Sequence, residues 1–197
     1  MRKYLLIVFM LLMSGTAGAQ DISLPKPQIT GGKPLMDVIA ARRTGRNFSA
    51  RQPDEQTLSN LLWSAWGISS PDGKRTIPTA RNKQNLNIYI LRPDGAYLYD
   101  AAANRLEKIT GEDLRPLTDG GQGFPKTVPL TLIYTAQEDY SAALHAGSAY
   151  QNVGLFCASF GLNNVVRGMI DREALNRKLK LPKGHVVLIS QIVGYPQ

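Results

Sequence analysis

The sequence predicts an α+β fold in which a central mixed sheet of four or five strands is flanked by helices on both sides. Helix-like and strand-like segments follow one another in mixed order along the chain, which favours this class. The strand-like segments are short apolar runs, and the last of them, 186–193, is apolar enough to lie inside a sheet. One helical segment, 141–162, is apolar nearly all round, so it should lie at the centre of the fold or at a subunit interface.

The first nineteen residues, 1–19, are predicted to be a cleavable signal peptide. Arg2 and Lys3 give a positive start, a run of ten apolar residues follows, and Ala17-Gly18-Ala19 is a small-x-small cleavage site. Ten residues are too few to span a bilayer as a helix, which needs about 20. We therefore expect cleavage after Ala19, a periplasmic or secreted protein, and no stable membrane anchor after cleavage. An uncleaved anchor is the alternative.

A single folded domain, 34–197, is expected to follow an extended N-terminal arm, 20–33, which is rich in proline and glycine. The domain should begin with a short helix over 34–41. Pro34 suits a first helical turn, and apolar residues recur on one face of the segment.

A second helix is expected over 53–67. Acidic residues at its beginning favour a helix N-terminus, and Gly67 is typical of a helix end. Trp63 and Trp66 lie three residues apart on this helix. Core or dimer packing is the expected role of these side chains, and a wall beside a planar ligand is the alternative.

Strands and turns account for most of the remaining chain. The runs 86–91 and 97–100 should form a hairpin, because Arg92-Pro93-Asp94-Gly95 between them has the residues of a turn. The other expected elements are a glycine-rich loop that can include a short helix (111–127), strands at 129–135, 165–166 and 186–193, and a helix over 172–179 capped by Asp171.

The composition excludes several kinds of function. The chain has 23 basic and 15 acidic residues, a formal net charge of +8. The arginines are scattered and no predicted helix carries a basic stripe, so nucleic acid is not expected as a partner. Cys157 is the single cysteine, so no internal disulfide can form, and its apolar neighbours predict a buried, unreactive thiol.

The two histidines, His145 and His185, lie far apart in the sequence without an acidic cluster, so no metal site is expected. A structural or dimer-interface role is expected for His145, with proton donation to a substrate as the alternative. No Gly-x-Gly-x-x-Gly follows a strand, which excludes a Rossmann nicotinamide domain. No serine lies at a sharp strand-to-helix turn, so a Ser-His-Asp site is not indicated.

Arg42, Arg43, Thr44 and Arg46 form a cluster directly after the first predicted helix. Arginine offers a planar fork of donors that fits phosphate oxygens two at a time, and the threonine hydroxyl adds another donor. The cluster can therefore grip a phosphate. A solvated basic patch is the alternative, because charged residues usually lie at the surface.

Four further motifs follow in order. They are Pro78-Thr79-Ala80-Arg81-Asn82-Lys83-Gln84, Gly147-Ser148-Ala149-Tyr150-Gln151-Asn152, Val166-Arg167-Gly168-Met169-Ile170-Asp171 and Val193-Gly194-Tyr195-Pro196. Together with the arginine cluster they resemble the nitroreductase-like flavoprotein superfamily over about residues 34–196. The spacing is most similar to the thiazoline-oxidase/dehydrogenase-type branch. This resemblance implies the nitroreductase-like fold as an interlocked homodimer, with noncovalent FMN at the interface.

The resemblance also implies roles for individual residues. The phosphate of FMN would meet Arg42, Arg43, Thr44 and Arg46. The ring and ribityl chain would meet Pro78, Thr79, Ala80 and Asn82 of the other subunit, with Gln84 nearby. A backbone N–H at Arg167-Gly168 would face flavin N5, where glycine permits close approach and a fixed donor stabilises the reduced flavin. No protein side chain is expected to act as a nucleophile.

The resemblance implies an FMN-dependent oxidoreductase that transfers a hydride between flavin and a small unsaturated or nitroaromatic-like substrate, and the predicted signal peptide adds that the enzyme is exported. Asn85-Leu86 stands where the family often has Pro-Trp, so the substrate cannot be inherited from relatives. The electron donor is unknown, since an exported protein would not normally meet NADH or NADPH. A non-enzymatic flavin- or ligand-binding protein with this fold is the alternative, and a dimeric interaction module without cofactor is a third reading.

Overall fold

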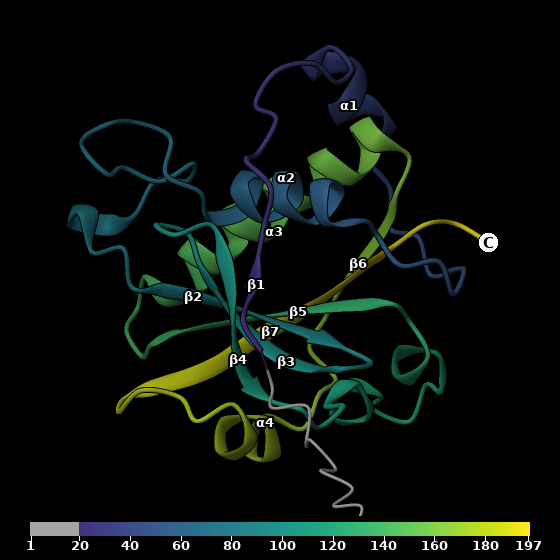
Figure 1. The fold of residues 1–197 in the computed structure, drawn as a ribbon, viewed down its shortest axis with the longest axis vertical. Coiled ribbons are helices and arrows are strands. Elements are labelled where there is room, and N and C mark those ends of the chain that lie inside the picture. The colour runs from purple at the N-terminus through teal and green to yellow at the C-terminus, as the bar shows by residue number, and fades with distance from the viewer. Residues whose placement is uncertain (1–19) are drawn as a thin grey trace, which may run out of the picture.

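The computed structural model describes residues 20–197, so the predicted signal peptide lies outside the described residues. The domain is built on one seven-stranded sheet with the order β1-β4-β3-β2-β5-β7-β6 (Figure 1). Every pair of neighbouring strands runs antiparallel. The strands are β1 (Ile22–Ser23), β2 (Leu86–Arg92), β3 (Gly95–Asp100), β4 (Arg105–Thr110), β5 (Leu130–Gln137), β6 (Asn163–Arg167) and β7 (His185–Gly194).

The predicted sheet of four or five mixed strands is therefore wrong in strand number and in direction. The sequence of β4 gives little strand signal, because Leu106 is its one fully buried residue and charged side chains surround it. β1 has two residues, too few for any periodicity. The direction of pairing is decided by tertiary connections: β2, β3 and β4 form a meander, whereas β5, β6 and β7 pair across intervening helices.

Helices cover both faces of the sheet, as expected. α1 (Leu35–Ala41), α2 (Glu55–Trp66) and α3 (Ala142–Phe160) lie on one face, and α4 (Arg172–Lys178) lies on the other (Figure 1). Alternate residues of β2 contribute to the two cores: Ile88 and Ile90 pack beneath α2 and α3, whereas Tyr89 and Leu91 pack on the side of α4.

The helix ends follow local chemistry. Asp54 caps α2 by accepting from the Thr57 N–H at 2.7 Å, and Asp171 caps α4 by accepting from the Ala174 N–H at 2.9 Å. Gly161 ends α3 in the left-handed conformation with φ 72°, which glycine adopts without a steric penalty. The loop between β4 and β5 contains two short 3-10 helices, η2 (Arg115–Thr118) and η3 (Phe124–Lys126), in agreement with the prediction for 111–127.

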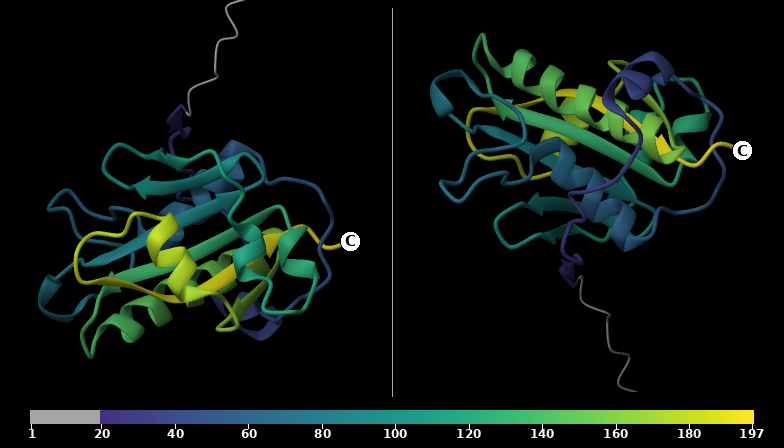
Figure 2. Two further views of the ribbon diagram at one scale, coloured as in Figure 1. Left: turned by 90° about the horizontal axis from the view of Figure 1, so that it is seen from below. Right: turned by 90° about the horizontal axis from the view of Figure 1, so that it is seen from above.

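The N-terminal arm crosses the outer surface of the α2–α3 layer (Figure 2). β1 joins the sheet at β4, and the arm then binds α2: Ser59 Oγ donates to the Pro25 carbonyl at 2.6 Å, and the Gln28 N–H donates to Asn60 Oδ1 at 2.7 Å. At its end, the Lys33 N–H donates to Ser159 Oγ of α3 at 2.9 Å. The arm is thus an ordered part of the domain.

The long helix α3 is buried on one side only. Ala149, Val153 and Cys157 are fully buried, and Trp66 of α2 packs into the same core, as predicted for it. The outer side of α3 leaves Leu144 exposed at 64%. No helix within residues 20–197 is long and apolar enough to cross a membrane.

Candidate functional site

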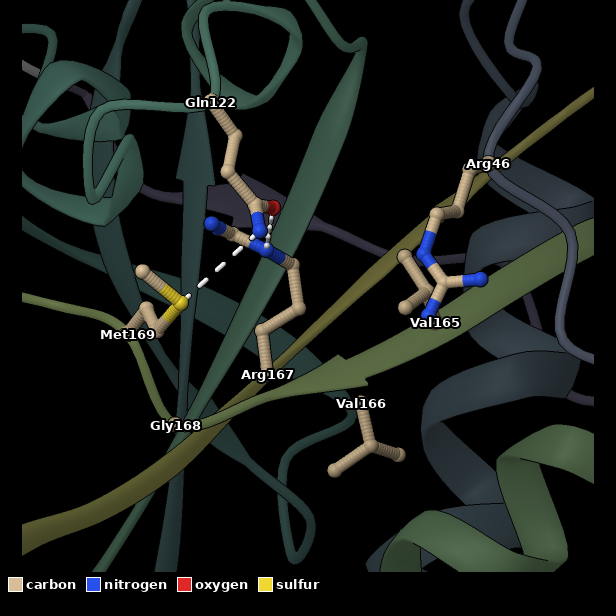
Figure 3. A pocket seen from close by; sticks show the side chains of 7 residues that line it. All are labelled: Arg46, Gln122, Val165, Val166, Arg167, Gly168 and Met169. Carbon is tan, nitrogen blue, oxygen red and sulfur yellow. Dashed lines mark hydrogen bonds between the residues drawn. The ribbon is translucent and has the colours of Figure 1, made fainter.

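A pocket of about 190 Å³ opens beside the C-terminal end of β6 (Figure 3). It joins the segment after α1, the loop between β4 and β5, and the end of β6. None of its lining side chains is a carboxylate. The lining residues are Arg46, Gln122, Val165, Val166, Arg167, Gly168 and Met169.

The arginine cluster is held against β6 by backbone contacts. The Gly45 N–H donates to the Asn164 carbonyl at 3.0 Å, and Asn163 Nδ2 donates to the Asn47 carbonyl at 2.7 Å. A Cβ at Gly45 would lie 2.4 Å from Asn163 Cγ. Glycine is therefore required for this close approach, which brings the first motif of the sequence to the fourth.

Arg42 and Arg43 have different surroundings at the end of α1. Arg42 is half-buried, and its aliphatic stem lies over Gly154 of α3, where an added Cβ would be 3.5 Å from Arg42 Cδ. Arg43 is exposed, and its Nη1 donates to the Ala40 carbonyl at 2.7 Å and to the Arg42 carbonyl at 2.9 Å. These two bonds satisfy carbonyl groups at the C-terminal end of α1.

Thr44 and Arg46 are both exposed, but Arg46 lies apart from the other arginines and lines the pocket at β6. It enters from the side opposite to Gln122 and Arg167 (Figure 3). Within residues 20–197, neither Arg42 nor Arg46 forms an ion pair. Both guanidinium groups therefore keep donors available for a ligand.

Arg167 is a structural anchor through its side chain. It is buried, and its guanidinium donates to the carbonyls of Thr118 and Asp119 and to Gln122 Oε1. Burial lowers the pKa of Arg167; the positive charge of Arg46 acts in the same direction, and Asp119 opposes it. The Arg167 side chain faces the loop between β4 and β5. The contribution predicted for the Arg167-Gly168 pair therefore rests on the backbone at Gly168.

The second predicted segment, 78–84, forms a strained loop around the 3-10 helix η1 (Ala80–Asn82). Arg81, Asn82 and Gln84 have φ values of 53°, 54° and 45°, in the left-handed region that side chains disfavour. Strain of this kind persists where the surroundings hold it, and it clusters at functional sites. Pro78 and Thr79 of this loop line two pockets, of about 300 Å³ and about 390 Å³.

The Gln84 side chain is fully hydrogen-bonded, both within its loop and to the segment that precedes it. Its Oε1 accepts from Arg75 Nε at 2.8 Å, and its Nε2 donates to the Gly73 carbonyl at 3.2 Å and to Asn82 Oδ1 at 3.0 Å. The Gln84 side chain therefore holds the shape of the loop. In the bond with Gln84, Asn82 accepts through Oδ1, so its amide nitrogen remains available to a ligand.

His145 fastens the loop to α3. Its Nε2 accepts from the Ala80 N–H at 2.8 Å, so the ring proton lies on Nδ1, which faces Asn85 Oδ1 at 3.0 Å. Both ring nitrogens are thus engaged and the side chain is buried. This geometry agrees with the structural role predicted for His145 and gives no support to proton donation.

The two predicted halves of the site do not meet within one chain. The 78–84 loop contacts α3 at His145, whereas the arginine cluster contacts α3 at Gly154. His145 and Gly154 are nine positions apart on α3, a distance of about 14 Å at 1.5 Å per residue. The pocket beside Gly168 shares no lining residue with the pockets beside Thr79.

Gln122 and Met169 also line the pocket, although neither was expected from the sequence to contribute to the site. Gln122 follows two glycines in an irregular loop, where no periodicity marks an inward-facing side chain. Met169 directly follows the predicted Arg167-Gly168 pair, and this position is the one sequence feature that could have indicated a role for it. In the described part of the chain, no group of three or more His, Cys, Asp or Glu side chains could hold a metal ion.

Comparisons with known proteins agree with this architecture. Residues 39–195 match the Nitroreductase family. A candidate nitroreductase of Ralstonia eutropha is 33% identical with a TM-score of 0.84, covering 93% of this chain and 92% of that one. A candidate nitroreductase of Methanocaldococcus jannaschii is 25% identical over 175 residues, 79% of this chain and 88% of that protein. An FMN-dependent nitroreductase of Clostridium difficile shares the fold with a TM-score of 0.62 at 16% identity, covering 83% of this chain and 88% of that one. The family match over most of the chain and the 33% identity to the Ralstonia eutropha protein show that the chain belongs to the nitroreductase family of oxidoreductases.

Proposed function

We propose that this protein is an exported FMN-dependent oxidoreductase that transfers a hydride between flavin and a small unsaturated or nitroaromatic-like substrate. The observation that carries the proposal is the pocket at the end of β6, which combines the guanidinium of Arg46 with the backbone of Gly168 and lacks a carboxylate. The family membership of the chain and the FMN dependence of a protein with the same fold support it.

The donors in the described residues fit FMN. Arg42, Arg43 and Thr44 offer positive charge and hydrogen-bond donors at the exposed end of α1, which suits a phosphate. Arg46 lies beside Gly168, so we assign it to the edge of the flavin ring, although the resemblance alone placed it at the phosphate. A cation at that edge stabilises negative charge on the reduced ring. When bound, the flavin supplies hydride transfer at N5.

Space at Gly168 is also suitable for a planar ring. Within 4 Å, an added Cβ at Gly168 would meet only Arg172 Nη2, at 3.7 Å. The backbone is therefore uncrowded on the side where a Cβ would lie, and the lack of a side chain lets a ring approach it closely. Val165 and Val166 add an apolar wall beside it.

We further propose that the protein is a homodimer in which the 78–84 loop of one subunit completes the flavin site of the other. This arrangement would bring together the two halves that lie about 14 Å apart along α3 in one chain. Exposed apolar side chains on α1 and α3, such as Met36 at 72% and Leu144 at 64%, are available for subunit contacts. Light scattering on the holoprotein at micromolar concentration tests the dimer; a clean monomer that still binds flavin would refute it.

The sequence also supports proposals about export and about the electron donor. The predicted signal peptide places the protein in the periplasm or outside the cell, where mass spectrometry should find a mature chain that starts at Gln20. We therefore propose that the electron donor is a molecule other than NADPH. As a separate proposal, the spacing of the motifs favours the thiazoline-oxidase/dehydrogenase-type branch of the family. Anaerobic stopped-flow with NADPH tests the donor: bleaching of the flavin band within about a second would show that the nicotinamide reaction survives.

Flavin binding by the Arg42→Ala/Arg43→Ala variant is the main test. Two charge-assisted hydrogen bonds of about 1.5 kcal/mol each make about 3 kcal/mol, or on the order of 100-fold in Kd. FMN fluorescence quenching with apoprotein measures this change. The control is Arg177→Ala/Lys178→Ala, which removes two exposed cations from α4 on the opposite face. If the arginine variant binds FMN as tightly as the control, the phosphate assignment is wrong.

The same preparation separates the alternatives. A protein that binds FMN but is not reoxidised by any acceptor after dithionite reduction would be a flavin-binding protein without catalytic function. A protein that does not bind FMN would be an interaction module that has kept the fold.

A further inference from the structure

The side chain of Gln122 is held in one orientation at the pocket beside Gly168 (Figure 3). Arg167 Nε donates to Gln122 Oε1 at 3.1 Å. A guanidinium nitrogen has no acceptor lone pair, so the Gln122 atom that faces it must be the oxygen. The amide nitrogen Nε2 is therefore turned to the other side, where it lies 3.7 Å from Met169 Sδ.

The loop that carries Gln122 is fixed, although it is rich in glycine. Arg167 also donates to the Thr118 carbonyl and, at 2.9 Å, to the Asp119 carbonyl. Gly120 packs directly on the segment that follows β6, since an added Cβ there would lie 2.6 Å from the Met169 carbonyl oxygen. The position of the Gln122 amide is thus decided by contacts on both sides of it.

Met169 Sδ is a poor partner for the Gln122 amide, because a thioether sulfur is a weak acceptor. The amide nitrogen Nε2 therefore remains available to donate a hydrogen bond to a stronger acceptor. Arg46, on the other side of the same pocket, is also a donor without an ion pair in residues 20–197. With no carboxylate in its lining, the pocket favours a ligand edge that carries acceptor oxygens.

We infer that Gln122 Nε2 donates a hydrogen bond to an acceptor oxygen conjugated to the reacting centre, bound beside Gly168. The oxygen is a ring carbonyl of the flavin, or a carbonyl or nitro oxygen of the substrate. Arg167 is the positioning residue, because it fixes which end of the amide faces the pocket. This inference rests on the proposed function.

Two variants separate donation from loop anchoring. Gln122→Glu keeps an oxygen for Arg167 and replaces the donor with an acceptor of the same shape. Gln122→Leu removes both polar atoms. Gln137→Glu is the control: it makes the same chemical change at an exposed residue at the end of β5, outside the pocket. Thermal melts of all three show whether the fold is kept.

The affinity of apoprotein for FMN is measured by fluorescence quenching. The oxidative half-reaction is then followed by mixing dithionite-reduced holoprotein with benzoquinone, nitrobenzene or ferricyanide. Ferricyanide takes electrons without docking an oxygen in the pocket, so it reports on the flavin alone.

We expect both Gln122 variants to raise one of two quantities at least tenfold: the Kd for FMN, or the half-saturating concentration of benzoquinone and nitrobenzene. A raised Kd for FMN in both variants assigns the oxygen to the flavin. An unchanged Kd, with a raised half-saturating concentration of benzoquinone and nitrobenzene and an unchanged rate with ferricyanide, assigns it to the substrate. Folded variants that match the control in both measurements would overturn the inference and leave the proposed function intact. Absence of FMN binding by the wild-type protein would overturn both.

Discussion

Replacing Gly45 with alanine tests whether the contact between the arginine cluster and β6 builds the site. The backbone at Gly45 is not in the left-handed region, so alanine brings no conformational strain there. Its Cβ would, however, lie 2.4 Å from Asn163 Cγ and 2.9 Å from Asn163 Cβ. The second atom is not at the flexible end of a side chain, so rotation of Asn163 alone cannot relieve the clash.

The expected cost can be worked from the bonds at this contact. If Asn163 moves, its bond to the Asn47 carbonyl at 2.7 Å is lost; if the cluster lifts, the bond from Gly45 to Asn164 at 3.0 Å is lost. Each bond contributes about 0.5–1.5 kcal/mol, and overpacking by one methyl costs about 1–3 kcal/mol. Because movement relieves part of the overpacking, we expect the free energy of unfolding to fall by about 1–3 kcal/mol. At this chain length that lowers Tm by about 2–4 °C per kcal/mol.

The control is Gly111→Ala, in which the added Cβ meets nothing within 4 Å and the backbone is again outside the left-handed region. Thermal melts by circular dichroism and FMN titration of the apoproteins are compared for both variants. Gly45→Ala should lose stability and FMN affinity together, since Arg42 and Arg46 flank the contact. If its Tm and Kd equal those of Gly111→Ala, the reasoning that this contact places the arginines is refuted.

Three further predictions follow from the described contacts. His145→Ala leaves the Ala80 N–H without its acceptor, so the free energy of unfolding should fall by about 1–3 kcal/mol and the Ala80 amide should exchange faster; unchanged protection of that amide would contradict the role of His145. Hydrogen bonds from Lys83 and then Ser141 hold the pKa of the Asp139 carboxyl below its ordinary value of 3.8. A lowered carboxyl pKa stabilises the folded state above the unfolded pKa, so the Tm difference between wild type and Asp139→Asn should be constant above about pH 4 and shrink as the pH falls further; a difference independent of pH would argue against the pairing. Burial raises the pKa of the Cys157 thiol, so a disulfide reagent at pH 8 should label this residue only after unfolding in urea, and rapid labelling of the folded protein would show that the thiol is accessible.

The helices and their ends were determined by the sequence alone. Asp171 caps its helix as predicted, the second helix begins at the acidic residues expected to start it, with Asp54 as the cap, and Gly161 ends the longest helix. Chemistry within one or two turns decides these features, so neighbours in the sequence suffice to predict them. The order of the motifs was also sufficient to identify the family, which the match over residues 39–195 confirms.

The predictions for Trp66 and Cys157 succeeded for the same reason. An apolar side chain on the apolar face of a helix is usually buried in the core, and both residues are buried there. Exposed Leu35 and Ile39 show the limit of this reasoning, since they lie on the apolar face of α1 and remain outside the core.

The tertiary structure alone decided the strand order and the contents of the site. β4 is polar, yet it is a strand because β3 and β1 supply its hydrogen-bond partners. Gln122 belongs to the pocket because Arg167, far along the chain, fixes its amide. Arg46 lies beside Gly168 because a missing side chain at Gly45 lets two distant backbones touch. Each of these features depends on contacts between residues far apart in the sequence, and local patterns carry no information about which distant groups will meet.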